Sequence, residues 1–202
     1  MQQLDSSLRV IVLGDQLVTA SGDPKGMGWV GRVQARTPQV DPTIELITLP
    51  YPDDTSLTLN KRWLAEVQPR QNQLGRTQVA IALGNHDIRA GLSTSRSRLN
   101  LATVLDEAMK YGLEPFVIGP VPHKEAALNS DVEQLSWGFE DVCARRNVPF
   151  VDCFHPLLGH EGWNQELQTS PSGLPGQVGY GLIAWLVLNR GWNAWLGVEE
   201  AE

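Results

Sequence analysis

The sequence predicts a single α/β domain in which a parallel β-sheet carries helices on both faces. Short apolar, β-branched segments alternate five times with segments whose apolar residues recur at helical spacing. The chain has 202 residues, of which 42% are hydrophobic and 19% charged, as in an ordinary globular protein with a real core. Because no repeat, low-complexity tract or linker divides the sequence, we take residues 1–202 as one domain.

The expected strands are apolar runs that end in turn-forming residues. They cover residues 8–14, 44–49, 78–83, 116–118 and 149–154. Gly14 closes the first run, and we expect it to let the chain turn sharply as it leaves the sheet. In an open parallel sheet, ligands bind beyond the carboxyl ends of the strands. Asp15 and Gln16 are therefore expected at the mouth of a site.

The expected helices follow the strands at regular intervals. One begins near residue 28, and the others cover residues 57–67, about 98–111, about 128–146 and about 179–188. The segments 18–25 and 155–176 are predicted to be loops, and the second of these contains Trp163.

Charge and hydropathy exclude some classes of partner. The net charge is −7 and the pI is about 5.1, which argues against nucleic-acid and anionic-membrane partners. No apolar stretch approaches the length of a membrane span. Residues 1–5 lack the basic and apolar regions of a signal peptide, so a cytoplasmic location is the default expectation. The sequence suggests no cofactor.

Cysteine and tryptophan usage gives two structural expectations. Cys143 and Cys153 are too few for a disulfide framework, and we expect both to be buried, unreactive thiols. Trp185, Trp192 and Trp195 lie near the C-terminus and are expected to seal the last helix onto the body of the domain.

Four short motifs occur in a characteristic order. Residues 14–17 read Gly-Asp-Gln-Leu, residues 54–56 Asp-Thr-Ser, residues 84–87 Gly-Asn-His-Asp and residues 179–181 Gly-Tyr-Gly. Their order and spacing resemble those of the SGNH hydrolases, also called GDSL-type esterases and lipases, over almost the whole chain. The resemblance implies a flavodoxin-like, three-layer α/β/α sandwich with about five parallel strands.

The resemblance also implies a mechanism. In that family a serine attacks an ester carbonyl, and a histidine, oriented by an aspartate three residues earlier, acts as its base. The serine N–H, a glycine N–H and an asparagine amide hold the oxyanion.

This chain departs from the family pattern at each of these positions. The positions of the serine, glycine, asparagine and aspartate are held by Gln16, Asp53, His86 and Ser172. The histidine has no counterpart between Leu174 and Pro175. We therefore predict a family member without the standard chemistry, with a binding or regulatory role and a small-molecule ligand in a vestigial pocket. The alternatives are an ester hydrolase with a non-standard site around Asp15, Asp53 and His86, or a weak metal-dependent hydrolase.

The residues expected to line the pocket follow the strand ends and the loop after the fourth strand. They are Asp15, Gln16, Asp53, His86, Asp87 and His123. Two carboxylates and an imidazole are plausible ligands for a divalent metal, which makes Asp15, Asp53 and His86 the metal candidates. We favour the simpler alternative, in which His86 and Asp53 pair with each other.

Two further patterns compete with this interpretation. Asp152 and His155, followed by proline, match Asp-x-x-His-Pro, but they directly follow the fifth strand, where the family has a non-catalytic segment. Residues 84–87 also resemble the Gly-Asn-His motif of calcineurin-like metallophosphoesterases, whose other metal-binding motifs are missing here.

Overall fold

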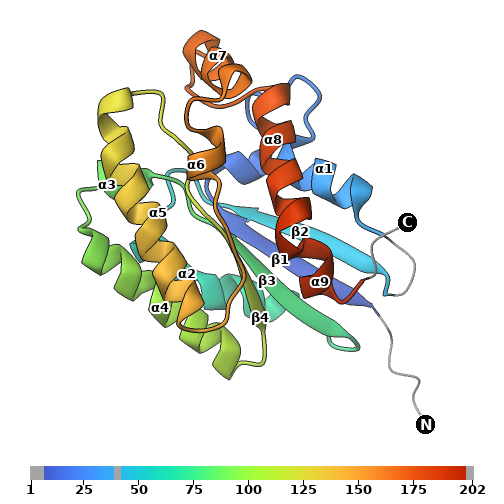
Figure 1. Ribbon diagram of the computed structural model, residues 1–202. Helices are drawn as coiled ribbons and strands as arrows, with labels where there is room; N and C mark the ends of the chain where they lie inside the picture. Colours follow the sequence, from blue (N-terminus) through green and yellow to red (C-terminus); the bar gives the residue numbers. More distant parts are fainter. Residues whose placement is uncertain (1–6, 39–41, 199–202) are drawn as a thin grey trace.

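The computed structural model describes residues 7–38 and 42–198 and contains a five-stranded parallel sheet (Figure 1). The strand order is β2-β1-β3-β4-β5, and every neighbouring pair is parallel. The strands are β1 Leu8–Gly14, β2 Ile44–Pro50, β3 Arg76–Ala82, β4 Glu114–Ile118 and β5 Phe150–Val151. The predicted α/β class is confirmed. Residues 1–5, in which we find no targeting signal, lie outside the described residues.

Helices cover both faces of the sheet, with α1 and α8 on one face and α2, α4 and α5 on the other (Figure 1). The α-helices are α1 Gly28–Arg36, α2 Ser56–Val67, α3 His86–Arg89, α4 Thr94–Lys110, α5 Asn129–Ala144, α6 Phe154–Leu157, α7 Glu161–Thr169, α8 Gln177–Val187 and α9 Asn193–Leu196. The remaining helical turns are the 3₁₀ turns η1 Gln16–Thr19, η2 Gln68–Arg70 and η3 Ala126–Leu128 and the π turn η4 Leu188–Trp192. Within the described segments, no helix combines the length and apolarity that crossing a bilayer requires.

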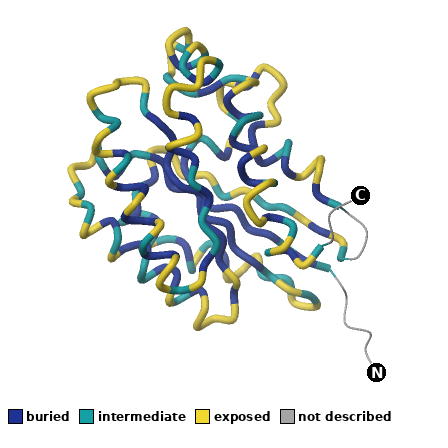
Figure 2. The backbone as a smooth tube through the Cα atoms, in the orientation of Figure 1, coloured by how far each residue is buried: buried dark blue, intermediate teal, exposed yellow. Residues whose placement is uncertain are grey.

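The core consists of two apolar layers separated by the sheet, and β1 contributes to both. Val10 and Val12 pack in the layer beneath α1 and α8, whereas Ile11 and Leu13 pack in the layer beneath α2 and α4. All four side chains are fully buried, and Figure 2 shows the central strands of the sheet in the colour of buried residues. A strand with two buried faces reads as a continuous apolar run, which is why β1 is so clear in the sequence.

The chain after β5 differs from the prediction. β5 has two residues, and α6 and α7 occupy most of the segment predicted to be a loop. His160 caps α7 by accepting a hydrogen bond from the N–H of Trp163, and Trp163 and Leu167 bury one face of that helix. Two buried positions four residues apart are too few to predict a helix with confidence from spacing alone, so the loop prediction for this segment is wrong.

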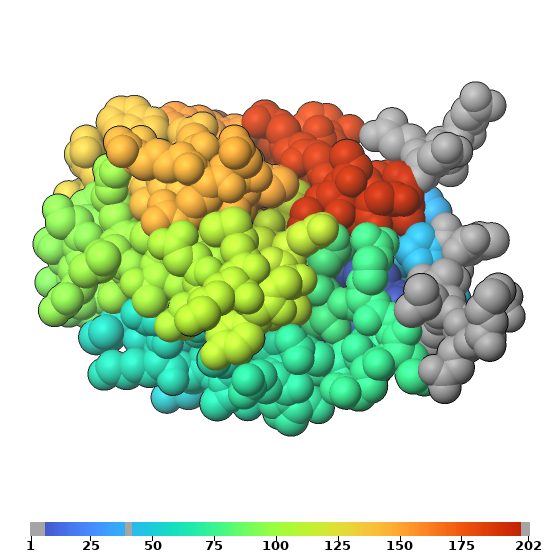
Figure 3. Space-filling view, turned by 90° about the horizontal axis from the view of Figure 1, so that it is seen from below, coloured from blue at the N-terminus to red at the C-terminus, as the bar shows by residue number. Residues whose placement is uncertain are grey.

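The C-terminal segment closes the amino end of the sheet. Trp192 is fully buried, and Phe116 lies 5.5 Å from its ring and 4.9 Å from that of Trp195. Gln78 on β3 donates to the carbonyl of Trp195, which matches the contact between the red and green segments in Figure 3. Trp185, by contrast, is 56% exposed on α8, so the prediction that it seals the helix is wrong.

Both cysteines are buried free thiols, as predicted. Burial raises the pKa of Cys143 to about 12 and also raises the pKa of Cys153, so their reactive thiolate forms are disfavoured.

Gly14 serves a close approach between two strands. It is the last residue of β1, and its φ lies outside the left-handed region. A Cβ at this position would lie 2.5 Å from the carbonyl oxygen of Ala82 and 3.0 Å from Cγ1 of Val18. The chain leaves the strand after Gly14, as predicted, since Asp15 already caps η1, but glycine is needed because β1 and β3 pack tightly where both strands end.

We expect Gly14→Ala to lower the free energy of unfolding by about 1–3 kcal/mol, because the added methyl group overpacks this junction. Gly181→Ala is the matched control, since Gly181 lies on α8 with open space around it. Alanine favours a helix by up to about 1 kcal/mol over glycine, so the control should be neutral or stabilising. Urea unfolding of both variants measures the difference, and equal effects would contradict the packing role of Gly14.

Candidate functional site

The site is built around the buried carboxylate of Asp15, at the carboxyl end of β1. Asp15 is 2% exposed and caps η1 by accepting a hydrogen bond from the N–H of Leu17 at 2.8 Å. Its Oδ2 lies 3.2 Å from Nε2 of His86. A Cβ on Gly84, which follows β3, would collide with the Asp15 carboxylate. The ends of β1 and β3 thus create a cavity that fits one carboxylate.

His86, the first residue of α3, lies between two carboxylates. Nε2 faces Asp15, and Nδ1 lies 3.6 Å from Oδ1 of Asp53. The hydrogen bond to Asp15 raises the pKa of His86 against the opposing effect of burial, and the negative charges of Asp15 and Asp53 raise it further. The environment therefore favours the imidazolium form.

Gln16 and Asp53 bind each other in both directions. The Gln16 amide nitrogen donates to Oδ1 of Asp53 at 3.3 Å, and the Asp53 backbone N–H donates to Oε1 of Gln16 at 3.0 Å. Asp53 has a φ of 55°, in the left-handed region where glycine is favoured. This conformation fits the glycine position that the resemblance assigns to residue 53.

The structure brings Asp15, Gln16, Asp53 and His86 together but places Asp87 elsewhere. Asp87 is 3% exposed and accepts a hydrogen bond from the backbone N–H of Ser56 at 2.7 Å. Ser56 begins α2, where N–H groups lack partners within the helix. The prediction that Asp87 lines the pocket is therefore wrong, because its carboxylate supports the start of α2.

A pocket of about 240 Å³ opens beside Asp15, and four segments of the chain form its wall. These segments lie within residues 15–17, 84–89, 121–125 and 163–175. Gln16, His86, His123 and Ser172 line it, as the sequence predicts for the first three. Asp53 lies outside the lining, and its side chain is 78% exposed.

His123 is held on the side of the pocket formed by the loop after β4. Nδ1 lies 2.9 Å from the backbone nitrogen of Glu125, and Nε2 lies 2.7 Å from Nη2 of Arg89. Burial lowers the pKa of His123, and the positive charge of Arg89 lowers it further. The two histidines of the pocket therefore have pKa values shifted in opposite directions.

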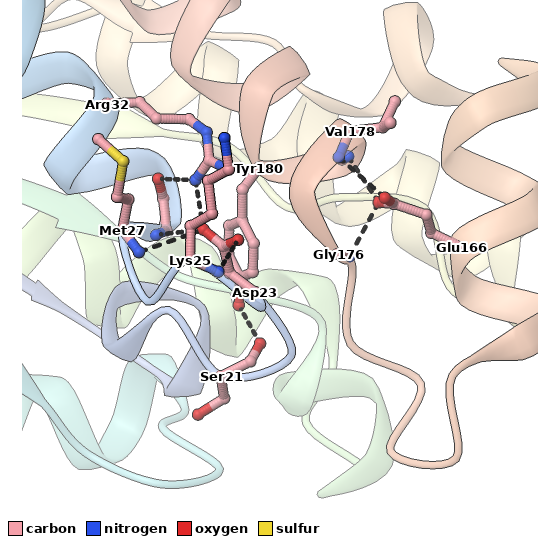
Figure 4. A network of polar contacts seen from close by, with 11 residues as sticks. Ser21, Asp23, Lys25, Met27, Arg32, Glu166, Gly176, Val178 and Tyr180 are labelled. Carbon is pink, nitrogen blue, oxygen red and sulfur yellow. Dashed lines mark hydrogen bonds and ion pairs between the residues drawn. The ribbon is translucent and has the colours of Figure 1, made fainter.

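Glu166 on α7 fixes the loop that precedes α8. Its carboxylate accepts hydrogen bonds from the N–H groups of Gly176, Val178 and Gly179, at 2.7–2.8 Å (Figure 4). A carboxylate at this position satisfies the free N–H groups of the helix start and interacts favourably with the helix dipole. Sequence reasoning missed Glu166, because it lies ten residues before Gly176 and only the packing of α7 brings the two together.

The loop between η1 and α1 is anchored beside α8. Asp23 accepts hydrogen bonds from the N–H groups of Lys25, Met27 and Gly28 and pairs with Arg32 at 2.5 Å (Figure 4). The hydrogen bond from Arg32 holds the pKa of Asp23 well below its ordinary value, although burial opposes the shift. The Tyr180 hydroxyl donates to the carbonyl of Ser21 and joins this loop to α8.

The competing Asp-x-x-His pair forms outside the pocket lining. Nδ1 of His155 lies 2.9 Å from Asp152, and Nε2 lies 3.2 Å from Glu133. The His155 ring also stacks on Trp137 with 5.9 Å between ring centroids. His155 is thus occupied by its own neighbours on the surface of α5 and α6.

The metal alternative has no suitable ligand arrangement. Among the residues that the structure describes, no group of three or more histidine, cysteine, aspartate or glutamate side chains is placed to hold a metal ion. Asp15, Asp53 and His86 instead face one another as an ion-paired cluster.

This fold and this arrangement at the strand ends define the class of three-layer α/β/α domains with a site at the carboxyl edge of the sheet. Residues 12–182 match the profile of the GDSL-like Lipase/Acylhydrolase family. The chain therefore belongs to this family. The match includes residues 84–87, so the metallophosphoesterase interpretation of that motif is wrong.

Solved structures of esterases share the fold at low sequence identity. A lipase/acylhydrolase from Enterococcus faecalis gives a TM-score of 0.72 at 21% identity over 96% of this chain and 99% of that chain. The acetylxylan esterase Axe2 from Geobacillus stearothermophilus gives 0.70 at 17% identity over 96% of both chains. The psychrotrophic esterase EstA from Pseudoalteromonas sp. gives 0.70 at 18% identity over 94% and 98%. The comparison with curated proteins gave no match.

We expect His86 to titrate above, and His123 below, the ordinary histidine pKa of 6.5. A raised histidine pKa adds stability that is complete below pH 6.5 and is lost as the pH rises through the folded-state pKa. NMR titration of the imidazole resonances, assigned with His86→Gln and His123→Gln, measures both values. The reverse order of the two pKa values would contradict the ion-paired cluster.

Two variants of Asp53 separate its backbone strain from its side-chain contacts. Asp53→Gly and Asp53→Ala both remove the carboxylate, but only glycine adopts a positive φ without a steric penalty. We expect the glycine variant to be more stable by about 0.5 kcal/mol, after allowing for its more flexible unfolded chain. Thermal unfolding measures the difference in stability between the two variants. An alanine variant more stable than the glycine variant would contradict backbone strain at residue 53.

Proposed function

We propose that this protein has lost the ester hydrolysis of its family and uses the remaining pocket to bind a small molecule, in a binding or regulatory role. The observation that carries the proposal is the pairing of Gln16 with Asp53 at the position where the family has its nucleophile. A carboxamide does not attack an acyl carbonyl, and both ends of this one are already hydrogen-bonded.

The charge distribution supports the proposal. His86 lines the same pocket as Gln16, but the upward shift of its pKa favours the protonated ring, which has no free electron pair to accept a proton. The exposed carboxylate of Asp53 adds negative charge beside Gln16. An oxyanion formed at this position would instead need hydrogen-bond donors.

Residues 171–176, which stand where the family has its catalytic aspartate and histidine, also support the proposed loss of hydrolysis. The hydroxyl of Ser172 lies 3.1 Å from that of Ser170 and 3.4 Å from the N–H of Leu174, so Ser172 interacts within its own loop. No histidine lies within residues 171–176. The pocket nevertheless stays open, which is what ligand binding without chemistry requires.

We expect purified protein to hydrolyse short p-nitrophenyl esters no faster than buffer and to resist labelling by a fluorophosphonate probe. Loss of the nucleophile alone costs about 10⁶-fold in a serine hydrolase. Gln16→Ser should not restore turnover, because residues 171–176, where the family has its catalytic histidine, contain none to activate the new hydroxyl.

The controls separate this proposal from hydrolysis through a non-standard site. An active esterase of the family provides the positive control for both reagents. His86→Ala and Asp15→Asn test whether any residual rate belongs to the cluster. Turnover above buffer that either substitution abolishes would overturn the proposal and support water activation by His86.

A further inference from the structure

The pocket lining includes two positive charges without carboxylate partners. Arg89 and Lys124 both line the pocket, and neither forms an ion pair with any residue in the described segments. The Lys124 ammonium lies 3.4 Å from the carbonyl oxygen of Gln168 and 3.2 Å from that of Ser170. In a chain with net charge −7, two uncompensated cations around one pocket indicate a site for an anion.

Both ring nitrogens of His123 face hydrogen-bond donors, although a neutral ring can accept only one hydrogen bond. A neutral imidazole has one N–H and one acceptor nitrogen, and a guanidinium has donors only. Nδ1 faces the N–H of Glu125 at 2.9 Å, so the neutral ring carries its proton on Nε2. That N–H then points at a donor nitrogen of Arg89, 2.7 Å away.

The opposite tautomer does not remove this conflict. Moving the proton to Nδ1 would let Nε2 accept from Arg89 but would set the new N–H against the backbone N–H of Glu125. In either state two donors face each other without an acceptor. An anion that binds beside the pair and draws the Arg89 guanidinium and the Nε2–H of His123 apart would accept from both and resolve the conflict.

The remaining lining limits the kind of anion. Asp15 and Glu125 also line the pocket, and their negative charges would repel a dianion more than a monoanion. Trp163, Leu167 and Leu174 add apolar lining next to the cations. The volume of about 240 Å³ lies below the range of about 300–1,000 Å³ that is typical for drug-sized ligands.

We propose that this pocket binds a small monocarboxylate whose oxygens accept hydrogen bonds from Arg89 and His123 and whose short apolar group rests on Trp163, Leu167 and Leu174. This inference rests on the proposed binding function and specifies its ligand class. The carboxylate distinguishes the ligand from a neutral ester, because only a charged acceptor also compensates the positive charge of Arg89 and makes charge-assisted hydrogen bonds.

Calorimetric titration of the full chain with butyrate, methyl butyrate and inorganic phosphate tests the assignment. We expect saturable butyrate binding at neutral pH and at least about tenfold weaker binding of methyl butyrate, which lacks the charge. Butyrate should also shift the Nε2–H resonance of His123. Phosphate binding tighter than butyrate binding would overturn the monocarboxylate in favour of a phosphate site.

Two arginine substitutions provide the matched variants. Arg89→Gln should weaken butyrate binding by about tenfold or more, because it removes a charge-assisted hydrogen bond. Arg96→Gln removes the same charge from an exposed position on α4 outside the pocket lining and should leave the affinity unchanged. Equal affinities of the two variants would refute the role of Arg89, and thermal unfolding checks that both are folded.

Ester hydrolysis measured on the same preparations keeps the two proposals apart. Butyrate binding together with clear esterase turnover would overturn the loss of hydrolysis and leave the anion site standing. An inert protein that binds butyrate and methyl butyrate equally, or neither of them, would overturn the monocarboxylate site alone.

Discussion

The buried carboxylate of Asp15 is the constraint on which the mouth of the site depends. A charge removed from water costs several kcal/mol unless it is paired and hydrogen-bonded, by order-of-magnitude estimates. The Leu17 N–H supplies one hydrogen bond and His86 supplies the countercharge. Gly84 leaves the necessary space, because any side chain there would meet the carboxylate. These requirements fix η1 and α3 relative to each other, and with α3 they place Arg89 on the pocket wall.

The same pairing gives a physical reason for the proposed loss of hydrolysis. Catalysis needs a free electron pair on a base and donors where negative charge develops. Here Asp15 and Asp53 both raise the pKa of His86 and so favour its protonated form, and the Gln16 carboxamide is bonded to Asp53. His86 and Gln16 thus already have interaction partners among their neighbouring residues. The family fold is intact while the groups at the strand ends interact chiefly with one another, which separates fold from function.

Features set by local sequence were predictable, and those set by tertiary contacts were not. The buried run of β1 and the gathering of Gln16 and His86 at strand ends followed from short patterns and the geometry of parallel sheets. Asp87 was misplaced, because its partner, the N–H of Ser56, lies 31 residues away. Glu166 carries no local signal of its hydrogen bonds to α8, and the helix containing Trp163 has too few buried positions to show a period.

The charged groups of the pocket differ in how far their charges are compensated. At the strand ends, Asp15 and His86 pair directly, so little charge is left there for a ligand. Arg89 at the end of α3 and Lys124 in the loop after β4 meet a ring nitrogen and backbone carbonyls, which are weaker partners for a cation than carboxylates are. A carboxylate ligand would give these cations the partner that the protein does not supply. Recognition should therefore come from Arg89 and Lys124, although the family's chemistry lies at the strand ends.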